Sequence, residues 1–303
     1  MSGGTSREGT MKKRATNRLE RNDRLVRLAL LTVAFSAVSI LLVITVFIIE
    51  QGVPIMFKYG LKSFLAGGDW YPSEKVFGLW PMIVGSIYVT LGAMVLGVPF
   101  GLACAIVLTE FSSRRVRRII KPVIELLAGI PSVVYGFMGV VILVPFIRQT
   151  FGGPGLSVLA ASIILGIMIL PTIISISVDA LQAIPPSYRE GSIALGATKW
   201  QTVKMVLLPA ARSGIVASVI LGMGRAIGET MAVIMVAGNA ASVPGSLLAP
   251  VRTLTSNIAL ELGYAAGEHR QALFATGVIL FVIIMVLNTV ANVTASRMKG
   301  PRR

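Results

Sequence analysis

The sequence predicts an all-α integral membrane protein with six membrane-spanning helices. Of its 303 residues, 54% are hydrophobic and only 14% are charged, and the mean hydropathy is +0.80. Soluble domains average roughly 45–50% apolar and about 25% charged residues. Six apolar runs also reach the length of about 18 residues that a bilayer core requires. They cover residues 28–49, 81–108, 123–146, 156–178, 215–236 and 272–291.

We expect the first run, 28–49, to be a retained helix and not a signal peptide, because it is too long and no small-residue cleavage site follows it. Later runs contain Pro99, Pro131 and Pro171, which membrane helices tolerate where neighbouring groups satisfy the freed backbone. The predicted organisation is a basic tail (1–27), a six-helix permease domain (28–296) and a second basic tail (297–303).

The net charge of +15 sets the predicted orientation. Lysine and arginine number 28, against 13 acidic residues, and they lie between apolar runs, which favours an orientation signal over nucleic-acid binding. The two tails and the loops after the second and fourth runs hold 21 of these bases, and the opposite side holds six. The positive-inside rule therefore predicts that both termini are cytoplasmic, in a multi-pass plasma (inner) membrane protein.

Composition also excludes several kinds of site. With one cysteine (Cys104) and one histidine (His269), an intramolecular disulfide, a metal centre and a His-dependent hydrolase are disfavoured. The sequence contains no Gly-x4-Gly-Lys-Ser/Thr loop for ATP phosphates. We therefore expect no cofactor on this chain, and any ATP-driven activity would use a partner chain.

Two outer loops are long enough to fold. The first, residues 50–80, contains Trp70, Tyr71 and Trp80, aromatic residues that suit the membrane interface. The last, residues 239–271, has the pattern of a short helix over about 253–264.

The cytoplasmic loop at about 185–210 predicts a helix–turn–helix. A Pro185–Pro186 turn precedes helix-compatible residues up to Leu195, and Gly196 is typical of a helix end. A second amphipathic segment over 198–207 is expected to stop before Pro209. An ordinary interfacial loop is the alternative.

This loop resembles the EAA loop of ABC-importer permeases. Glu190, Gly196 six residues later, Val206 ten beyond that, and Leu208–Pro209 have that family's spacing, with Gly191 and Ser192 replacing its two alanines. The resemblance implies a coupling helix that docks in a groove of the ATPase subunit. The residues implied in this coupling are Glu190, Gly191, Ser192, Gly196, Trp200, Leu208 and Pro209.

Span five carries charges. Arg225 and Glu229 are four residues apart, so they are expected to share a helix face and to pair. A charge at bilayer depth costs roughly 2.5–3.5 kcal/mol and usually marks a cavity or pathway. One interpretation is a structural ion pair. The other is that Arg225 binds a tetrahedral oxyanion on a substrate path, where Glu229 would favour hydrogenphosphate over sulfate by accepting a hydrogen bond from its protonated oxygen. Thr230 is a further path candidate.

Span three offers a possible path or gate at Pro131, Ser132 and Tyr135. Pro131–Ser132 could kink the helix beside the path and Tyr135 could line it. A simple helix kink is the alternative.

The segments 125–136, 224–233 and 238–239 resemble phosphate-specific ABC-importer permeases of the PstC type. That resemblance implies a type I ABC-importer permease architecture, a second, PstA-like permease subunit, two ATP-binding subunits, an extracytoplasmic phosphate-binding protein and the lipid membrane as partners. A permease for another oxyanion (sulfate, molybdate) and a membrane scaffold that signals phosphate status to a sensor kinase or its adaptor remain alternatives. We expect this chain to be no enzyme.

Overall fold

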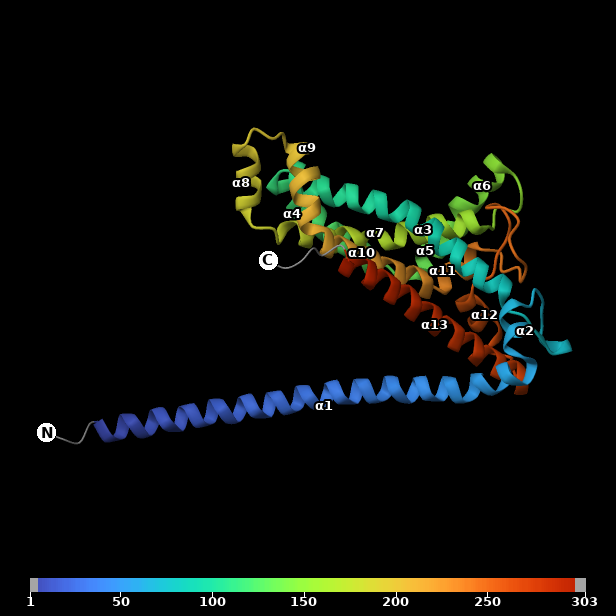
Figure 1. The fold of residues 1–303 in the computed structure, drawn as a ribbon, viewed down its shortest axis with the longest axis horizontal. Helices are drawn as coiled ribbons and strands as arrows, with labels where there is room; N and C mark the ends of the chain where they lie inside the picture. Colours follow the sequence, from blue (N-terminus) through green and yellow to red (C-terminus); the bar gives the residue numbers. More distant parts are fainter. Residues whose placement is uncertain (1–4, 298–303) are drawn as a thin grey trace. The chain divides into compact units, whose positions relative to one another are not determined.

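A computed structural model describes residues 5–297, with side chains described for 26–291 and 293 (Figure 1). It divides into two units, Met1–Gln51 and Gly52–Arg303. The described part of the first unit is one continuous helix, the larger part of α1 (Thr5–Tyr59). From Thr5 onward the predicted basic tail 1–27 is therefore part of the same helix as the first span. The predicted tail 297–303 lies outside the described residues except for Arg297.

The second unit contains residues 52–59 of α1 and all later elements. Its first half holds α2 (Leu61–Ala66), β1 (Trp70–Tyr71), η1 (Pro72–Glu74), β2 (Val76–Phe77), α3 (Trp80–Ile106), η2 (Val107–Phe111), α4 (Arg114–Ala128), α5 (Ser132–Met138), η3 (Gly139–Leu143) and α6 (Val144–Phe151). Its second half holds α7 (Val158–Gln182), α8 (Pro186–Ala194), α9 (Lys199–Thr202), η4 (Val203–Leu207), α10 (Leu208–Gly228), α11 (Met231–Val236), α12 (Leu254–Glu261) and α13 (Gly267–Arg297). The segments η2, η3 and η4 are π-helical turns.

Six described helical segments are long and apolar enough to cross a membrane, which confirms the predicted number of spans. They are Val26–Tyr59, Trp80–Phe111, Ser132–Phe151, Val158–Gln182, Lys199–Gly228 and Gly267–Ala291. Their bounds differ most from the predicted ones in spans three and five.

The predicted start of span three was wrong. Residues 123–128 belong to α4, a separate helix that bears the five bases of the loop after the second run and has no buried residue. The helix is interrupted at residues 129–131, where Pro131 cannot donate a backbone hydrogen bond, and α5 begins at Ser132. An amphipathic helix with a basic polar face is typical of a segment lying along the membrane surface.

Helix α7 lies at the centre of the second unit. Of its most apolar 18-residue window, 61% is buried, compared with 33% for Trp80–Phe111. Glycines of α3 line the contact with it: a Cβ on Gly97 would lie 2.6 Å from Ile169 Cδ1, and one on Gly101 would lie 2.7 Å from Ile173 Cγ2. Small residues at such a contact let two membrane helices approach closely.

The first outer loop is folded. Strands β1 and β2 pair antiparallel, with Trp70 opposite Phe77, and both side chains are 5% exposed in a core shared with Phe64 and Leu254. Trp70 is therefore a core residue rather than the interfacial aromatic that we predicted, whereas Tyr71 and Trp80 are exposed. The predicted short helix in the last loop is confirmed as α12.

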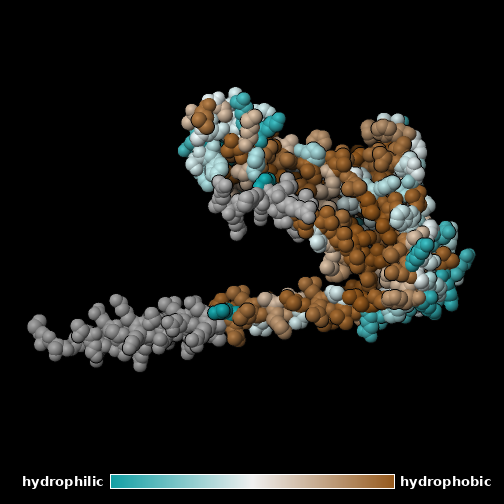
Figure 2. All heavy atoms as spheres, in the orientation of Figure 1, coloured by the Kyte–Doolittle hydropathy of each residue, from teal (hydrophilic) through white to brown (hydrophobic). Residues whose placement is uncertain are grey.

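Polar surface gathers at opposite ends of the second unit (Figure 2). Hydrophobic atoms cover its middle, and hydrophilic atoms lie over α8 and α9 at one end and near α2 at the other. This distribution matches an apolar belt between two aqueous faces. It also places the predicted coupling loop at the end opposite the folded outer loops.

Replacing Gly97 with leucine is predicted to destabilise the protein, because the new side chain would collide with Ile169 at the α3–α7 contact. Overpacking of this kind costs about 1–3 kcal/mol. Thermal unfolding of the purified protein in detergent should show a lower Tm. The matched control is Ala103→Leu at an exposed position of the same helix, for which we expect no change. Equal Tm values for the two variants would contradict the packing described here.

Candidate functional site

The helical run that carries Arg225 is interrupted beside it. Helix α10 ends at Gly228, and Glu229 has an extended backbone (φ −69°, ψ 132°) before α11 begins at Met231. The prediction that Arg225 and Glu229 share one helix face was therefore wrong. No ion pair joins them among the described residues. Side-chain bonds to nearby backbone groups compete with the helix at this point.

Glu229 bonds to elements beyond this break through its side chain and its own backbone carbonyl. Its Oε1 accepts a hydrogen bond from the Ala232 backbone N–H at 3.2 Å, in the first turn of α11. Its own carbonyl accepts from the Thr255 hydroxyl of α12 at 2.9 Å. Thr230, the third predicted path residue, donates to the Gly228 carbonyl at 3.3 Å. Because buried backbone groups need such partners, Glu229 and Thr230 shape the break.

Arg225 is left without a carboxylate partner among the described residues. It is half-buried, and its Nη1 donates a long hydrogen bond of 3.4 Å to Thr172 Oγ1 on α7. A guanidinium in an apolar helix, with most of its five N–H donors unused, favours an anion. The missing ion pair strengthens the anion interpretation over the structural one.

The predicted gate segment lies against α11. A Cβ on Gly136 would be 2.7 Å from Met235 Sδ and 3.0 Å from Ala232 Cα, so α5 and α11 are in close contact. Pro131 caps α5 and Ser132 is its first residue. The hydroxyl of Tyr135 donates to the Leu127 carbonyl at 2.8 Å, which ties the end of α4 to α5. Tyr135 thus has a structural bond in addition to any role on a path.

The predicted coupling loop has the expected first half. Helix α8 carries Glu190 and Gly191, both exposed, and Gly196 takes the left-handed backbone (φ +82°) that ends it. Ser192 is buried and bonds to the Thr202 hydroxyl at 3.0 Å, which packs α8 against α9. A capping box formed by Thr198 and Gln201 starts α9.

The second half differs from the prediction. The helical run does not stop before Pro209 but continues through η4 and Leu208 into α10. The wider π turn of η4, directly before Pro209, accommodates a residue that cannot donate to the preceding turn. The second half of the predicted coupling loop is therefore continuous with α10, the helix that carries Arg225.

Apolar side chains gather on the outside of this loop. Leu195 is 90% exposed and Met205 70%, and Trp200 is also exposed. Leu195 and Met205 border an open groove of about 720 Å³ between α8 and the start of the next helical run. A patch of this kind on a loop is typical of a docking surface.

A buried polar cluster in the outer loops was not predicted. Glu261, 6% exposed, accepts from Trp70 Nε1 (2.8 Å) and Arg252 Nη1 (2.7 Å) and lies 2.8 Å from His269 Nε2. Arg252 Nε also donates to the Asn239 carbonyl at 2.9 Å, just beyond α11. Trp70 and Glu261 are 191 positions apart, so no local spacing could have revealed the cluster.

Comparisons with known proteins agree with this arrangement. Residues 97–300 match the family described as binding-protein-dependent transport system inner membrane component. The chain is 43% identical to the probable ABC transporter permease protein YqgH of Bacillus subtilis, over 84% of this chain and 85% of the relative. It is 36% identical to the phosphate transport system permease protein PstC of Mesorhizobium japonicum, over 91% and 93%.

Solved structures support the fold. An inward-facing structure of the MetNI methionine ABC transporter matches with a TM-score of 0.56 at 21% identity, over 74% of this chain and 95% of the matched chain. A bacterial alginate ABC transporter matches with a TM-score of 0.57 at 16% identity, over 82% and 87%. The chain therefore belongs to the binding-protein-dependent transport system inner membrane components, as a multi-pass permease subunit of an ABC importer.

Proposed function

We propose that this permease subunit carries inorganic phosphate. Its relatives named for phosphate transport, such as PstC of Mesorhizobium japonicum, support this substrate. The observation on the chain itself that supports it is Arg225, a half-buried guanidinium with no carboxylate partner among the described side chains. Its planar fork can bind two oxygens of a tetrahedral oxyanion.

The assembly follows from the family. An importer permease of this kind works with ATPase subunits and a substrate-binding protein. We infer that the second permease is PstA-like, that two ATP-binding subunits hydrolyse the ATP, and that the binding protein delivers phosphate to the folded outer loops. This chain would supply half of the path and no covalent chemistry. A signalling contact with a sensor kinase or its adaptor would be a second role of the same chain, separate from transport.

Alternating access would use the elements already described. ATP binding would close the ATPase dimer and pull on α8 through the coupling residues around Glu190, and the path would open outward to receive phosphate. Hydrolysis would reset it inward. Arg225 would hold the anion, and Glu229, whose Oε2 has no hydrogen bond within the described chain, would accept a hydrogen bond from the protonated oxygen of hydrogenphosphate.

Substitution of Arg225 by glutamine should reduce phosphate uptake roughly tenfold or more, because a hydrogen bond to a charged group contributes about 1.5–3 kcal/mol. Labelled phosphate uptake would be measured in cells whose only high-affinity route uses this chain, with assembly checked by co-purification of the ATPase. The control is Arg212→Gln, at the other end of α10. Retained uptake in the assembled Arg225 variant would remove this residue from the path.

Substitution of Glu229 by glutamine should weaken the preference for phosphate over sulfate by roughly fivefold, since sulfate has no proton to donate and a neutral amide is a poorer acceptor. Binding of labelled phosphate, with sulfate as competitor, would be measured on the permease–ATPase complex without binding protein. That omission keeps the binding protein's own selectivity out of the result. An unchanged preference would count against this role.

Both termini and the coupling loop are predicted to face the cytoplasm. In a Cys104→Ala background, Gly68→Cys in the first outer loop should react with a membrane-impermeant maleimide in intact cells. Arg115→Cys, which is exposed on α4, should react only after lysis. The reverse labelling pattern would invert the proposed orientation.

A further inference from the structure

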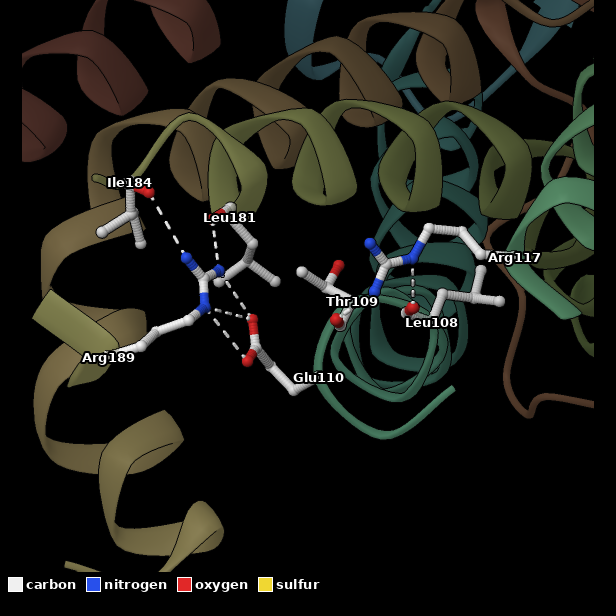
Figure 3. A network of polar contacts seen from close by, with 7 residues as sticks. All are labelled: Leu108, Thr109, Glu110, Arg117, Leu181, Ile184 and Arg189. Carbon is white, nitrogen blue, oxygen red and sulfur yellow. Dashed lines mark hydrogen bonds and ion pairs between the residues drawn. The ribbon is translucent and has the colours of Figure 1, made fainter. Parts of the chain in front are cut away.

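One arginine of the coupling helix reaches outside its own loop. Arg189, on α8, forms an ion pair with Glu110 of η2 (Figure 3). Nη2 lies 2.7 Å from Glu110 Oε1, and Nε lies 3.2 Å from each carboxylate oxygen. The side chains are 25% and 13% exposed, so the pair is largely shielded from water and from salt screening.

The same guanidinium also holds the end of α7. Its Nη2 donates to the Leu181 carbonyl at 2.9 Å and its Nη1 to the Ile184 carbonyl at 3.3 Å. Carbonyls at a helix C-terminus lack intrahelical partners and favour a cation. Arg189 therefore joins α8, the end of α7 and the cytoplasmic end of span two at one point.

The π turn η2, which carries Glu110, is held by a second arginine. On the other side of η2, Arg117 of α4 donates from Nε to the Leu108 carbonyl at 2.8 Å and from Nη2 to the Thr109 carbonyl (Figure 3). The π turn is thus held by two arginines from different helices. Because Arg117 holds the backbone of η2 and Arg189 holds the Glu110 carboxylate, a pull on that carboxylate can be passed to span two.

Span two is not next to the coupling loop along the chain, because α4, α5, α6 and α7 lie between them. Helix α8 follows α7 directly and continues through α9 into α10, so spans four and five move with it through the chain itself. The Ser192–Thr202 bond lies within the loop. Among the described side chains of α8, it is Arg189 that forms an ion pair with a different span.

We propose that the Arg189–Glu110 pair transmits movement of the coupling helix to span two. Arg189 is then a positioning residue, because it acts through Glu110 and touches neither phosphate nor ATP. This inference rests on the assignment as an importer permease but not on the choice of substrate. Without the pair, the ATPase should still dock and hydrolyse ATP, while span two follows less completely and less substrate crosses per ATP.

The test is a double-mutant cycle in proteoliposomes that contain the whole importer and its binding protein. Arg189→Gln and Glu110→Gln should each lower the ratio of phosphate transported to ATP hydrolysed by about tenfold, within the range of typical coupling between sites. Hydrolysis itself should change less than about twofold. The double variant should be no worse than either single one, as expected for residues that act as a unit.

Two controls separate this role from a structural one. Lys121→Gln and Asp179→Asn break an exposed 3.0 Å ion pair between α4 and α7 that does not involve the coupling loop, and they should leave the ratio unchanged. Arg189→Lys, which keeps the charge, should restore part of the ratio and substitutes for Arg189→Gln if that variant does not assemble. Additive losses, or uptake and hydrolysis that fall in parallel, would overturn the proposal.

A measurement that does not depend on the substrate separates failure of this proposal from failure of the proposed function. A nitroxide attached at Leu91→Cys in a Cys104→Ala background, on the exposed side of α3, should change its spectrum when ATP is added. Arg189→Gln should abolish that change. If wild type moves no phosphate but Arg189→Gln still abolishes the spectral change, the substrate is wrong and the link stands. An unaltered response in Arg189→Gln would refute the link.

Discussion

The structure depends on one constraint: backbone polar groups within a membrane must find partners inside the protein. Where helices are interrupted, side chains provide those partners. At the α10–α11 break, Glu229 accepts from the Ala232 N–H and Thr255 donates to the Glu229 carbonyl. At the end of α4, the Tyr135 hydroxyl donates a hydrogen bond to the Leu127 carbonyl. Polar residues that look functional in the sequence therefore also shape the backbone.

This constraint explains why Arg225 is available to an anion. Glu229 Oε1 accepts from the Ala232 N–H beyond the break, and no ion pair joins Glu229 to Arg225 among the described residues. The same helical run that carries Arg225 begins at the coupling loop and passes Pro209 without interruption, through the π turn of η4. In the proposed mechanism, a pull on the loop would reach Arg225 along one helix, and the Arg189–Glu110 pair would pass the same movement to span two.

Much of the fold could be predicted because it depends on periodic or compositional signals. Six apolar runs predicted six spans, and Gly196 with its flanking segments predicted the helix–turn–helix. The predictions that failed concern positions where side-chain bonds or a change of helix type override the regular helical pattern. A four-residue spacing predicted that Arg225 pairs with Glu229. Instead, α10 ends at Gly228, and the Glu229 side chain accepts a hydrogen bond from the first turn of α11. Pro209 suggested a helix end, but the π turn of η4 before it lets the helical run continue into α10. The Glu261 cluster and the Arg189–Glu110 pair join distant residues and leave no local pattern.

The central claim is that Arg225 meets the transported anion while Glu229 holds the helix break. Its most direct measurement is an electron cryomicroscopy map of the assembled importer, trapped with ATP by a hydrolysis-deficient ATPase and supplied with phosphate. The account predicts a phosphate oxygen about 3 Å from the Arg225 guanidinium, with Glu229 still bonded to the start of α11. An Arg225–Glu229 ion pair in that map, with phosphate bound elsewhere, would contradict it.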